Sequence, residues 1–258
     1  MKTSIKYPKW QILTLRTFIH LIFLSAISFI KSINDIAFIK LSNGPKNLLT
    51  EPEFIDRKIL TEWLESNKEI KALIITGEGR HFSHGAYVSL FSDSSCSDNI
   101  TEKLENAKKL LDTIENLPIV TVAAINGGCF GGGLETALSC QFRICSPKAF
   151  LGLPEIMHGV IPGMAGIERL AKLIGKEKTV SMCLSGEILS AQKALEYNLV
   201  SSVTAQKDAL PEAIEFTKEI IAGKSKLQIE CIIDTINQTL NGIPNASKGK
   251  FETVLKQH

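Results

Sequence analysis

Apolar residues along this chain occur in two alternating spacings, which predicts strands and helices that follow one another. Short apolar runs are typical of buried strands, and they fall at residues 35–41, 71–76, 118–125 and, more briefly, 142–145. Apolar positions recur at helical spacing over residues 51–66, 100–117, 165–174 and 190–198, and a further helix is expected from Leu134. From Pro211 onward the pattern is mostly helical. The pattern therefore predicts an α/β fold with a helical C-terminal region.

Two polar residues mark the ends of the helix predicted at residues 190–198. The hydroxyl of Ser190 can accept a hydrogen bond from a free backbone N–H of the first turn. Asn198 tolerates the left-handed conformation in which many helices end.

The first 33 residues depart from this pattern and are expected to form an atypical N-terminal extension. Four basic residues within positions 1–16 precede an apolar run at residues 18–30, an order typical of a signal peptide. The run is shorter than the about 20 residues of a membrane span. It contains His20, and no small-residue cleavage site precedes Lys31. An extra strand, an interfacial helix and an unstructured extension all fit the run, and we expect a cytoplasmic protein without a membrane anchor.

Composition narrows the class of protein. At 258 residues, with 44% hydrophobic and 22% charged residues, the chain can bury one sizeable core. A net charge of +2 without a dense Lys/Arg run does not suggest nucleic-acid binding. The six cysteines include no CxxC pair and have no nearby histidine at ligand spacing, so we expect free thiols rather than a metal site or a disulfide framework.

The candidate chemistry lies in two loops that follow predicted strands, where ligands usually bind in an open α/β layer. The first loop, residues 77–88, reads Gly-Glu-Gly-Arg-His-Phe-Ser-His-Gly-Ala-Tyr-Val. The second, residues 126–135, reads Asn-Gly-Gly-Cys-Phe-Gly-Gly-Gly-Leu-Glu and leads into a helix. Glycines let backbone N–H groups approach a ligand closely, and a helix start adds free donors and a positive dipole end. Such a place suits an anionic oxygen.

Three interpretations fit the second loop. It could be a plain tight turn, which is the default for any glycine-rich stretch. It could be a dinucleotide-binding turn, but the spacing is not G-x-G-x-x-G and the segment lies in mid-chain. It could also be an oxyanion hole, and the wider sequence bears on that choice.

Four blocks of the sequence resemble signatures of the enoyl-CoA hydratase/isomerase (crotonase) family. Residues 125–138 are similar to the family's apolar strand, Asn-Gly, Gly-Gly-Gly and helix. Residues 81–86, His-Phe-Ser-His-Gly-Ala, resemble its first oxyanion loop. Residues 150–170 and 184–200 resemble its third and fourth blocks. The blocks follow the family's order, which implies a crotonase-like core at residues 34–205 and a shortened helical region at residues 206–258.

The resemblance implies a fold and a set of catalytic groups. The expected fold is a spiral of ββα units with a C-terminal helical region that packs across a homotrimer or a dimer of trimers. The backbone N–H groups of Ala86 and Gly132 would bind the thioester carbonyl oxygen, and Glu135 and Glu155 fall on the family's acid/base positions. Outside this context, Glu135 would be a charge that favours the helix dipole, and Glu155 a solvated loop residue.

The resemblance also implies an acyl-CoA substrate. Coenzyme A would be the carrier of the acyl group, with no other cofactor and no metal ion. It would enter near Lys46, Ser83, Gly85 and Ala86, and the contact with Lys46 is the least supported because its loop is shorter than usual in the family.

Several residues depart from the family pattern. Tyr87 stands where Asp is common and could line the acyl pocket or merely pack, whereas His84 replaces a small residue and could touch the nucleotide or lie on the surface. His158 is close enough in sequence to Glu155 to tune its pKa. The chain also stops at residue 258, short of the family's usual last helix, which leaves substrate affinity and oligomeric state open.

The resemblance implies reversible hydration of a 2-enoyl-CoA, because two carboxyl groups can exchange protons with both water and the α-carbon. Double-bond isomerisation, hydration of a cyclic dienoyl-CoA and decarboxylation of an acyl thioester are alternatives on the same site. A non-catalytic acyl-CoA-binding homologue is another. A serine peptidase on the related ClpP-like spiral is excluded because no serine with a matched His and Asp lies near Gly132.

Overall fold

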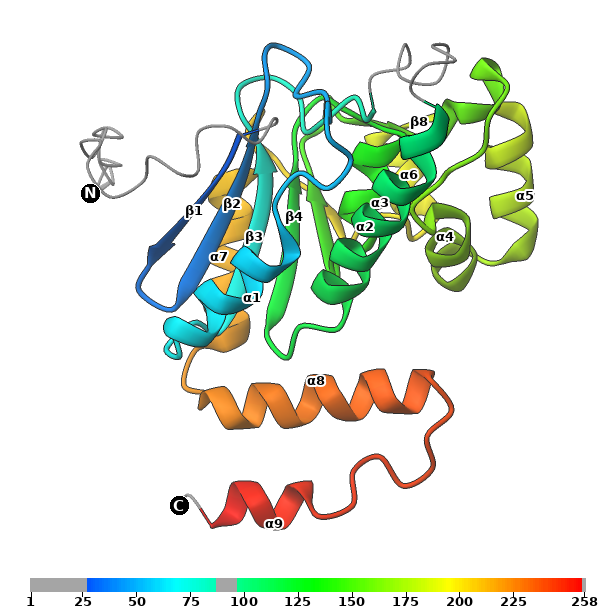
Figure 1. Cartoon of the computed structure of the whole chain (residues 1–258). Helices are drawn as coiled ribbons and strands as arrows, with labels where there is room; N and C mark the ends of the chain where they lie inside the picture. The colour runs from blue at the N-terminus through cyan, green and yellow to red at the C-terminus, as the bar shows by residue number, and fades with distance from the viewer. Residues whose placement is uncertain (1–26, 87–96, 257–258) are drawn as a thin grey trace, which may run out of the picture.

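The computed structural model describes residues 27–86 and 97–256 of the chain (Figure 1). Most of the N-terminal extension, including the basic segment and His20, lies outside the described residues. Tyr87 lies outside them as well, so its expected roles stay predictions.

A six-stranded sheet forms the centre of the fold. Its order is β1 (Ile27–Ile33), β2 (Ile36–Ser42), β3 (Ala72–Gly77), β4 (Val120–Ile125), β6 (Phe142–Cys145) and β9 (Ser202–Val203). β1 pairs antiparallel with β2, and every other pair is parallel. The four predicted strands and the α/β class are confirmed. The end of the apolar N-terminal run forms β1, so an extra strand is the correct interpretation for Ile27–Ile33.

The central strands are buried on both faces, which explains their uninterrupted apolar sequences. Ile39 of β2 and Ile75 of β3 point into one hydrophobic cluster, while Phe38 and Ile74 point into the other. Figure 1 shows α1 and α2 in front of the sheet and α7 behind it. Each face of the sheet is therefore covered by its own helical layer.

The helices that precede the C-terminal part are α1 (Arg57–Ser66), α2 (Ser97–Glu115), α3 (Gly132–Leu138), α4 (Gly166–Ile174), α5 (Lys176–Ser185) and α6 (Ala191–Glu196). The prediction that a helix begins at residue 51 is wrong by six residues. Asp56 accepts hydrogen bonds from the N–H groups of Lys58 and Ile59, so α1 begins directly after this cap. α5 was not predicted, because it buries few residues and shows no apolar stripe.

The N-cap role predicted for Ser190 and the left-handed conformation predicted for Asn198 are confirmed. Ser190 accepts a hydrogen bond from the N–H of Lys193 at 3.3 Å, and Asn198 has a φ of 60°. The helix α6 itself is shorter than predicted and ends at Glu196.

A second, three-stranded sheet consists of β5 (Gly128–Phe130), β7 (Phe150–Gly152) and β8 (Ile188–Ser190), and it was not predicted. Strands of three residues are too short to show a period-two pattern. Because β5 occupies the glycine-rich turn, α3 follows directly and begins at Gly132, two residues before the predicted Leu134. The small sheet thus carries the second candidate loop.

The C-terminal part is helical, with α7 (Leu210–Ile221), α8 (Lys226–Leu240) and α9 (Lys250–Leu255). Ala213 of α7 and Ile229 of α8 belong to the hydrophobic cluster behind the sheet. α8 lies across one end of the sheet and α9 lies beyond it (Figure 1). The domain boundaries predicted at residues 33 and 205 stay predictions. No helix in the described ranges is both long and apolar enough to cross a bilayer.

Candidate active site

The two candidate loops lie side by side because β3 and β4, which lead into them, are parallel neighbours. The N–H of Phe82 donates to the carbonyl of Asn126 at 2.7 Å, and the N–H of Phe130 donates to the carbonyl of Ser83 at 3.0 Å. These hydrogen bonds run in both directions between the loops, so neither loop can shift without the other.

The backbones of the two loops approach each other so closely that Gly85 and Gly133 leave no room for a side chain. A Cβ on Gly85, whose φ is +80°, would lie 2.6 Å from the carbonyl oxygen of Phe130 and 2.9 Å from the nitrogen of Gly132. A Cβ on Gly133 would lie 2.4 Å from the carbonyl oxygen of Ser83. Side chains at either position would force the loops apart.

The close approach brings the N–H groups of Ala86 and Gly132 together. A Cβ built on Gly132 would lie 3.7 Å from the nitrogen of Ala86, in ordinary van der Waals contact. Gly132 is the first residue of α3, so its N–H has no partner inside the helix. Within residues 27–86 and 97–256, neither N–H donates a hydrogen bond. Two free amide donors therefore stand next to each other at a helix start.

A third segment supports the first loop. The N–H of Leu49 donates to the carbonyl of Gly85 at 2.9 Å, and the N–H of His84 donates to the carbonyl of Lys46 at 3.0 Å. The hydroxyl of Ser83 is fully buried, donates to the carbonyl of Asn47 and accepts from the N–H of Gly85. The side chain of Ser83 thus shapes the loop, whereas Lys46 is exposed.

Glu135 projects from the first turn of α3 and is 2% exposed. Its Oε1 accepts hydrogen bonds from the N–H groups of Met164 at 2.8 Å and Gly166 at 2.9 Å. Burial raises the pKa of Glu135 to about 6, although both hydrogen bonds act in the opposite direction. Glu135 is therefore a buried, oriented carboxyl group rather than an exposed charge at the helix start.

Glu155 is the second residue of the short 3₁₀ helix η2 (Pro154–His158), where a loop was predicted. Its Oε2 is buried and has no hydrogen-bond partner among the described residues. A Cβ on Gly131 would lie 3.1 Å from Oε1, so this carboxyl group faces the start of α3. Burial, and then the charge of Glu135, raises the pKa of Glu155 to about 7. The solvated alternative for Glu155 is wrong as well.

Three contacts that hold Glu135 were not predicted from the sequence. The backbone donors Met164 and Gly166 hold Glu135, and Arg169 donates to the carbonyl of Met164 at 2.6 Å. The side chain of Arg169 is 4% exposed and is paired with Asp112 and Glu115 of α2. Arg169 lies in the third family-like block, which is the one clue that the sequence offered.

The histidines of the site differ in their surroundings. His81 Nδ1 accepts from the N–H of Gly128 at 2.8 Å. The ring of His84 meets those of His81 and Phe130 edge to face, and its Nε2 is buried without a partner in the described structure. The surface interpretation of His84 is therefore wrong, since the ring is partly packed. His158 is exposed at the end of η2.

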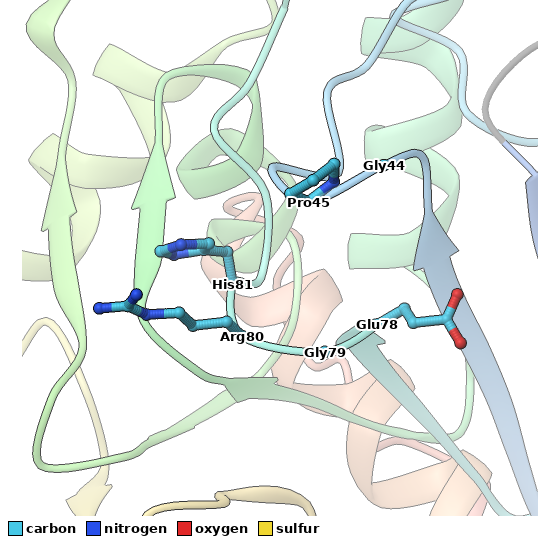
Figure 2. A pocket seen from close by; sticks show the side chains of 6 residues that line it. All are labelled: Gly44, Pro45, Glu78, Gly79, Arg80 and His81. Carbon is cyan, nitrogen blue, oxygen red and sulfur yellow. The ribbon is translucent and has the colours of Figure 1, made fainter.

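Two open cavities flank the first loop. The one of about 490 Å³ is lined by Gly44, Pro45, Glu78, Gly79, Arg80 and His81 (Figure 2). Figure 2 shows Arg80 and His81 extending together from the loop while Glu78 points the opposite way. The other, of about 760 Å³, adds Lys148 and Lys207 from the far side. Neither cavity is lined by Glu135 or Glu155, so the donors and carboxyl groups, rather than a cavity, define the candidate site.

Metal ligands are not gathered in the described part of the chain, since no three His, Cys, Asp or Glu side chains there could hold an ion. The five cysteines that it contains are free thiols, and burial raises the pKa of Cys140 and Cys145 to about 12.

Comparison with known proteins gives a consistent result. Residues 31–257 match the profile of the enoyl-CoA hydratase/isomerase family. A probable enoyl-CoA hydratase of Bacillus subtilis is 36% identical over 187 residues, which cover 72% of this chain and 71% of that protein. The fatty acid oxidation complex subunit alpha of Shewanella loihica is 37% identical over 76% of this chain, which spans only 28% of that larger protein.

Solved structures agree in fold. An enoyl-CoA hydratase of Bacillus anthracis superposes with a TM-score of 0.79 at 26% identity, covering 89% of this chain and 91% of that one. The spiral fold expected from the sequence is thereby confirmed.

Proposed function

Because this chain belongs to the enoyl-CoA hydratase/isomerase family, we propose that it adds water reversibly across the double bond of a 2-enoyl-CoA thioester. One observation carries the proposal. Two free N–H groups, of Ala86 and Gly132, stand at the start of the helix that also bears the buried carboxyl group of Glu135, and Glu155 faces the same helix start.

The N–H groups of Ala86 and Gly132 would receive the thioester carbonyl oxygen. Hydration builds negative charge on that oxygen as hydroxide adds to the β-carbon, and oriented donors stabilise the charge without reorganising. Loss of one such donor typically costs about 3 kcal/mol of transition-state stabilisation. The positive dipole end of α3 adds to the effect at Gly132.

The raised pKa values of the two carboxyl groups support one division of the proton transfers between them. Between pH 6 and 7 the carboxyl of Glu135 is mostly ionised and that of Glu155 mostly protonated, given pKa values of about 6 and about 7. Glu135 then takes a proton from water, whose oxygen bonds to the β-carbon, and Glu155 gives its proton to the α-carbon. Exchange of one proton between the two groups, directly or through water, restores the starting state.

Coenzyme A would carry the acyl group and leave no other cofactor necessary. We place its path along the segment that holds Lys46, Ser83, Gly85 and Ala86, since these residues border the free donors. The buried Ser83 would act through its backbone, and Lys46 through its exposed charge. Free thiols in the described chain favour a cytoplasmic location.

A homotrimer or a dimer of trimers is part of the proposal. Large apolar side chains of the C-terminal helices are exposed in the single chain, namely Ile232, Ile236, Leu240, Phe251 and Leu255. Exposed apolar surface of this extent is typical of an interface. Assembly through α8 and α9 would cover it.

The test is loss of enoyl-thioester absorbance with crotonyl-CoA and a panel of longer and cyclic enoyl-CoAs. Glu135→Gln and Glu155→Gln should each lower kcat by orders of magnitude, because each removes one proton transfer. Glu177→Gln is the matched control, since Glu177 is an exposed carboxyl group in the first turn of α5. Folded protein that hydrates no thioester of the panel would refute the hydratase.

Double-bond isomerisation is the second candidate, because the free Oε2 of Glu155 could take a proton from the α-carbon and return it to the γ-carbon. A 3-enoyl-CoA substrate separates the two reactions. Isomerisation would survive Glu135→Gln and disappear in Glu155→Gln, whereas hydration needs both groups. Binding of acyl-CoA without any turnover would indicate a non-catalytic homologue.

A further inference from the structure

We propose that neutral His81 is a positioning residue for the two carbonyl-binding loops, and that protonation of its ring releases them. The N–H of Gly128, in the second loop, donates to His81 Nδ1 at 2.8 Å. His81 lies five residues before Ala86, and Gly128 lies four residues before Gly132. The hydrogen bond therefore links the segments that carry the two free donors.

The ring of His81 fits closely against the second loop. A Cβ on Gly127, whose φ is +50°, would lie 2.7 Å from Nδ1, so the ring rests on the bare backbone of that turn. The backbone hydrogen bonds between the loops, such as that from Phe130 to Ser83, do not titrate. His81 adds a side-chain acceptor to them that does.

Protonation would reverse the character of this contact. An acceptor at Nδ1 requires the tautomer with its proton on Nε2, because a neutral imidazole has one donor and one acceptor nitrogen. A second proton would turn Nδ1 into a donor that faces the N–H of Gly128. Two N–H groups at 2.8 Å repel, so the ring or the turn at residues 126–128 must move.

Burial and neighbouring positive charges both favour the neutral ring of His81. Burial, then the charges of Arg80 and Lys46, lowers the pKa of His81 from its usual value of 6.5. The ring of His84 lies 4.5 Å away, and burial lowers its pKa too. The other charged groups that line the flanking cavities are Glu78, Lys148, Lys207 and Asp208. The contact should thus be intact at neutral pH and fail only in acid.

The catalytic consequence rests on the proposed function, but the contact itself can be tested without substrate. Amide spectra of protein labelled with ¹⁵N-glycine report on Gly128 and Gly132 directly. The measurement uses the Glu135→Gln/Glu155→Gln variant, in which neither carboxyl group titrates. We expect the Gly128 proton to move upfield as pH falls from 8 to 5, and Gly132 to change with the same midpoint below 6.5.

Two substitutions identify the group. His81→Asn places an amide oxygen where Nδ1 lies and does not titrate, so both pH-dependent shifts should vanish while the Gly128 hydrogen bond remains. His158→Asn, at an exposed histidine on η2, is the control and should leave both shifts in place. Shifts that persist in His81→Asn, or a Gly132 signal that stays constant while Gly128 titrates, would overturn the proposal.

Rates of crotonyl-CoA hydration test the catalytic consequence of the His81 contact separately from the proposed hydratase activity. If crotonyl-CoA is hydrated, His81→Leu should lower kcat by about tenfold at pH 7.5 with little change in KM, the effect of one lost hydrogen bond, and His81→Asn should restore it. Full activity of His81→Leu would refute the catalytic consequence. If no thioester is hydrated at all, the amide spectra still decide whether His81 positions the loops.

Discussion

The Oε1 atom of Glu135 accepts a hydrogen bond at 2.8 Å from the backbone N–H of Met164. The carbonyl of Met164 in turn accepts a hydrogen bond from Arg169, whose guanidinium is ion-paired with α2. A carboxyl group on α3 is thus oriented by a loop, and the loop is fixed by a buried cation. The position of Glu135 depends on residues more than 25 positions away in the sequence.

Replacement of Arg169 by methionine should change the acid/base behaviour of Glu135 as well as stability. The positive charge of Arg169 lowers the pKa of Glu135, so its loss should raise that pKa above about 6. The acid limb of kcat/KM would then move to higher pH. We also expect a loss of about 2–4 kcal/mol in the free energy of unfolding, measured in urea, because carbonyl and carboxylate partners are left unpaired.

A matched control distinguishes an effect on the orientation of Glu135 from a general loss of protein stability. Arg143 is as buried as Arg169, but its guanidinium donates to the carbonyls of Cys140 and Leu199. Arg143→Met should lose similar stability and keep the acid limb of the wild type. Equal pH profiles for the two variants would show that Arg169 only stabilises the fold.

The pH dependence of kcat/KM on crotonyl-CoA should be a narrow bell. Activity rises as Glu135 loses its proton, with a midpoint at about pH 6, and falls as Glu155 loses its own, with a midpoint at about pH 7. The charge of Glu168 raises the pKa of Glu135, so Glu168→Gln should move the acid limb slightly lower and leave the alkaline limb in place. Constant activity from pH 6 to 9 would contradict the assignment of the acid and the base.

Stability should also depend on the protonation of Glu135. Its pKa is higher in the folded state, about 6 against an ordinary 4.5, so the folded state binds the proton more tightly. The fold is therefore favoured below pH 4.5 and loses about 2 kcal/mol as pH rises to 6, after which the loss is constant. Urea unfolding of Glu135→Gln should show a gain over wild type that grows across this window. Parallel stability curves for the two proteins would refute the raised pKa.

Much of the sheet was predictable because its central strands are buried on both faces and are long enough to form recognisable apolar runs. Runs such as Val120–Ile125 contain no polar interruption other than Thr121, whose hydroxyl is bonded to the N–H of Gln141. The two glutamates and the two N–H groups were predicted from the resemblance to the family, in whose signature glycines and carboxyl groups recur. The structure places all four around the start of α3.

What could not be predicted depends on backbone groups or on short elements. Met164 and Gly166 donate through backbone N–H groups, which every residue type except proline carries. The residue types at these positions therefore do not predict the contact. The strands β5, β7 and β8 have three residues each, below the length at which alternation is visible. The start of α1, in contrast, could have been predicted from a side chain. Asp56 is a typical N-cap residue, and the helix begins after it although apolar residues at helical spacing precede it.

Gly85→Ala should separate the carbonyl-binding donors. The new Cβ would lie 2.6 Å from the carbonyl oxygen of Phe130 and 2.9 Å from the nitrogen of Gly132, and neither backbone atom can yield locally. The φ of +80° adds a strain of about 1–2 kcal/mol. We expect kcat on crotonyl-CoA to fall about 100-fold, the cost of a displacement on the order of 1 Å.

The control for that substitution is Gly223→Ala, which shares the strain but not the contact. Gly223 lies between α7 and α8, has a φ of +70°, and a Cβ there would meet nothing within 4 Å. It should lose about 1–2 kcal/mol in urea unfolding and keep the kcat of the wild type. If Gly85→Ala loses no more activity than Gly223→Ala, the separation between the two loops does not control the reaction, and the paired N–H groups of Ala86 and Gly132 cannot be its main source of stabilisation.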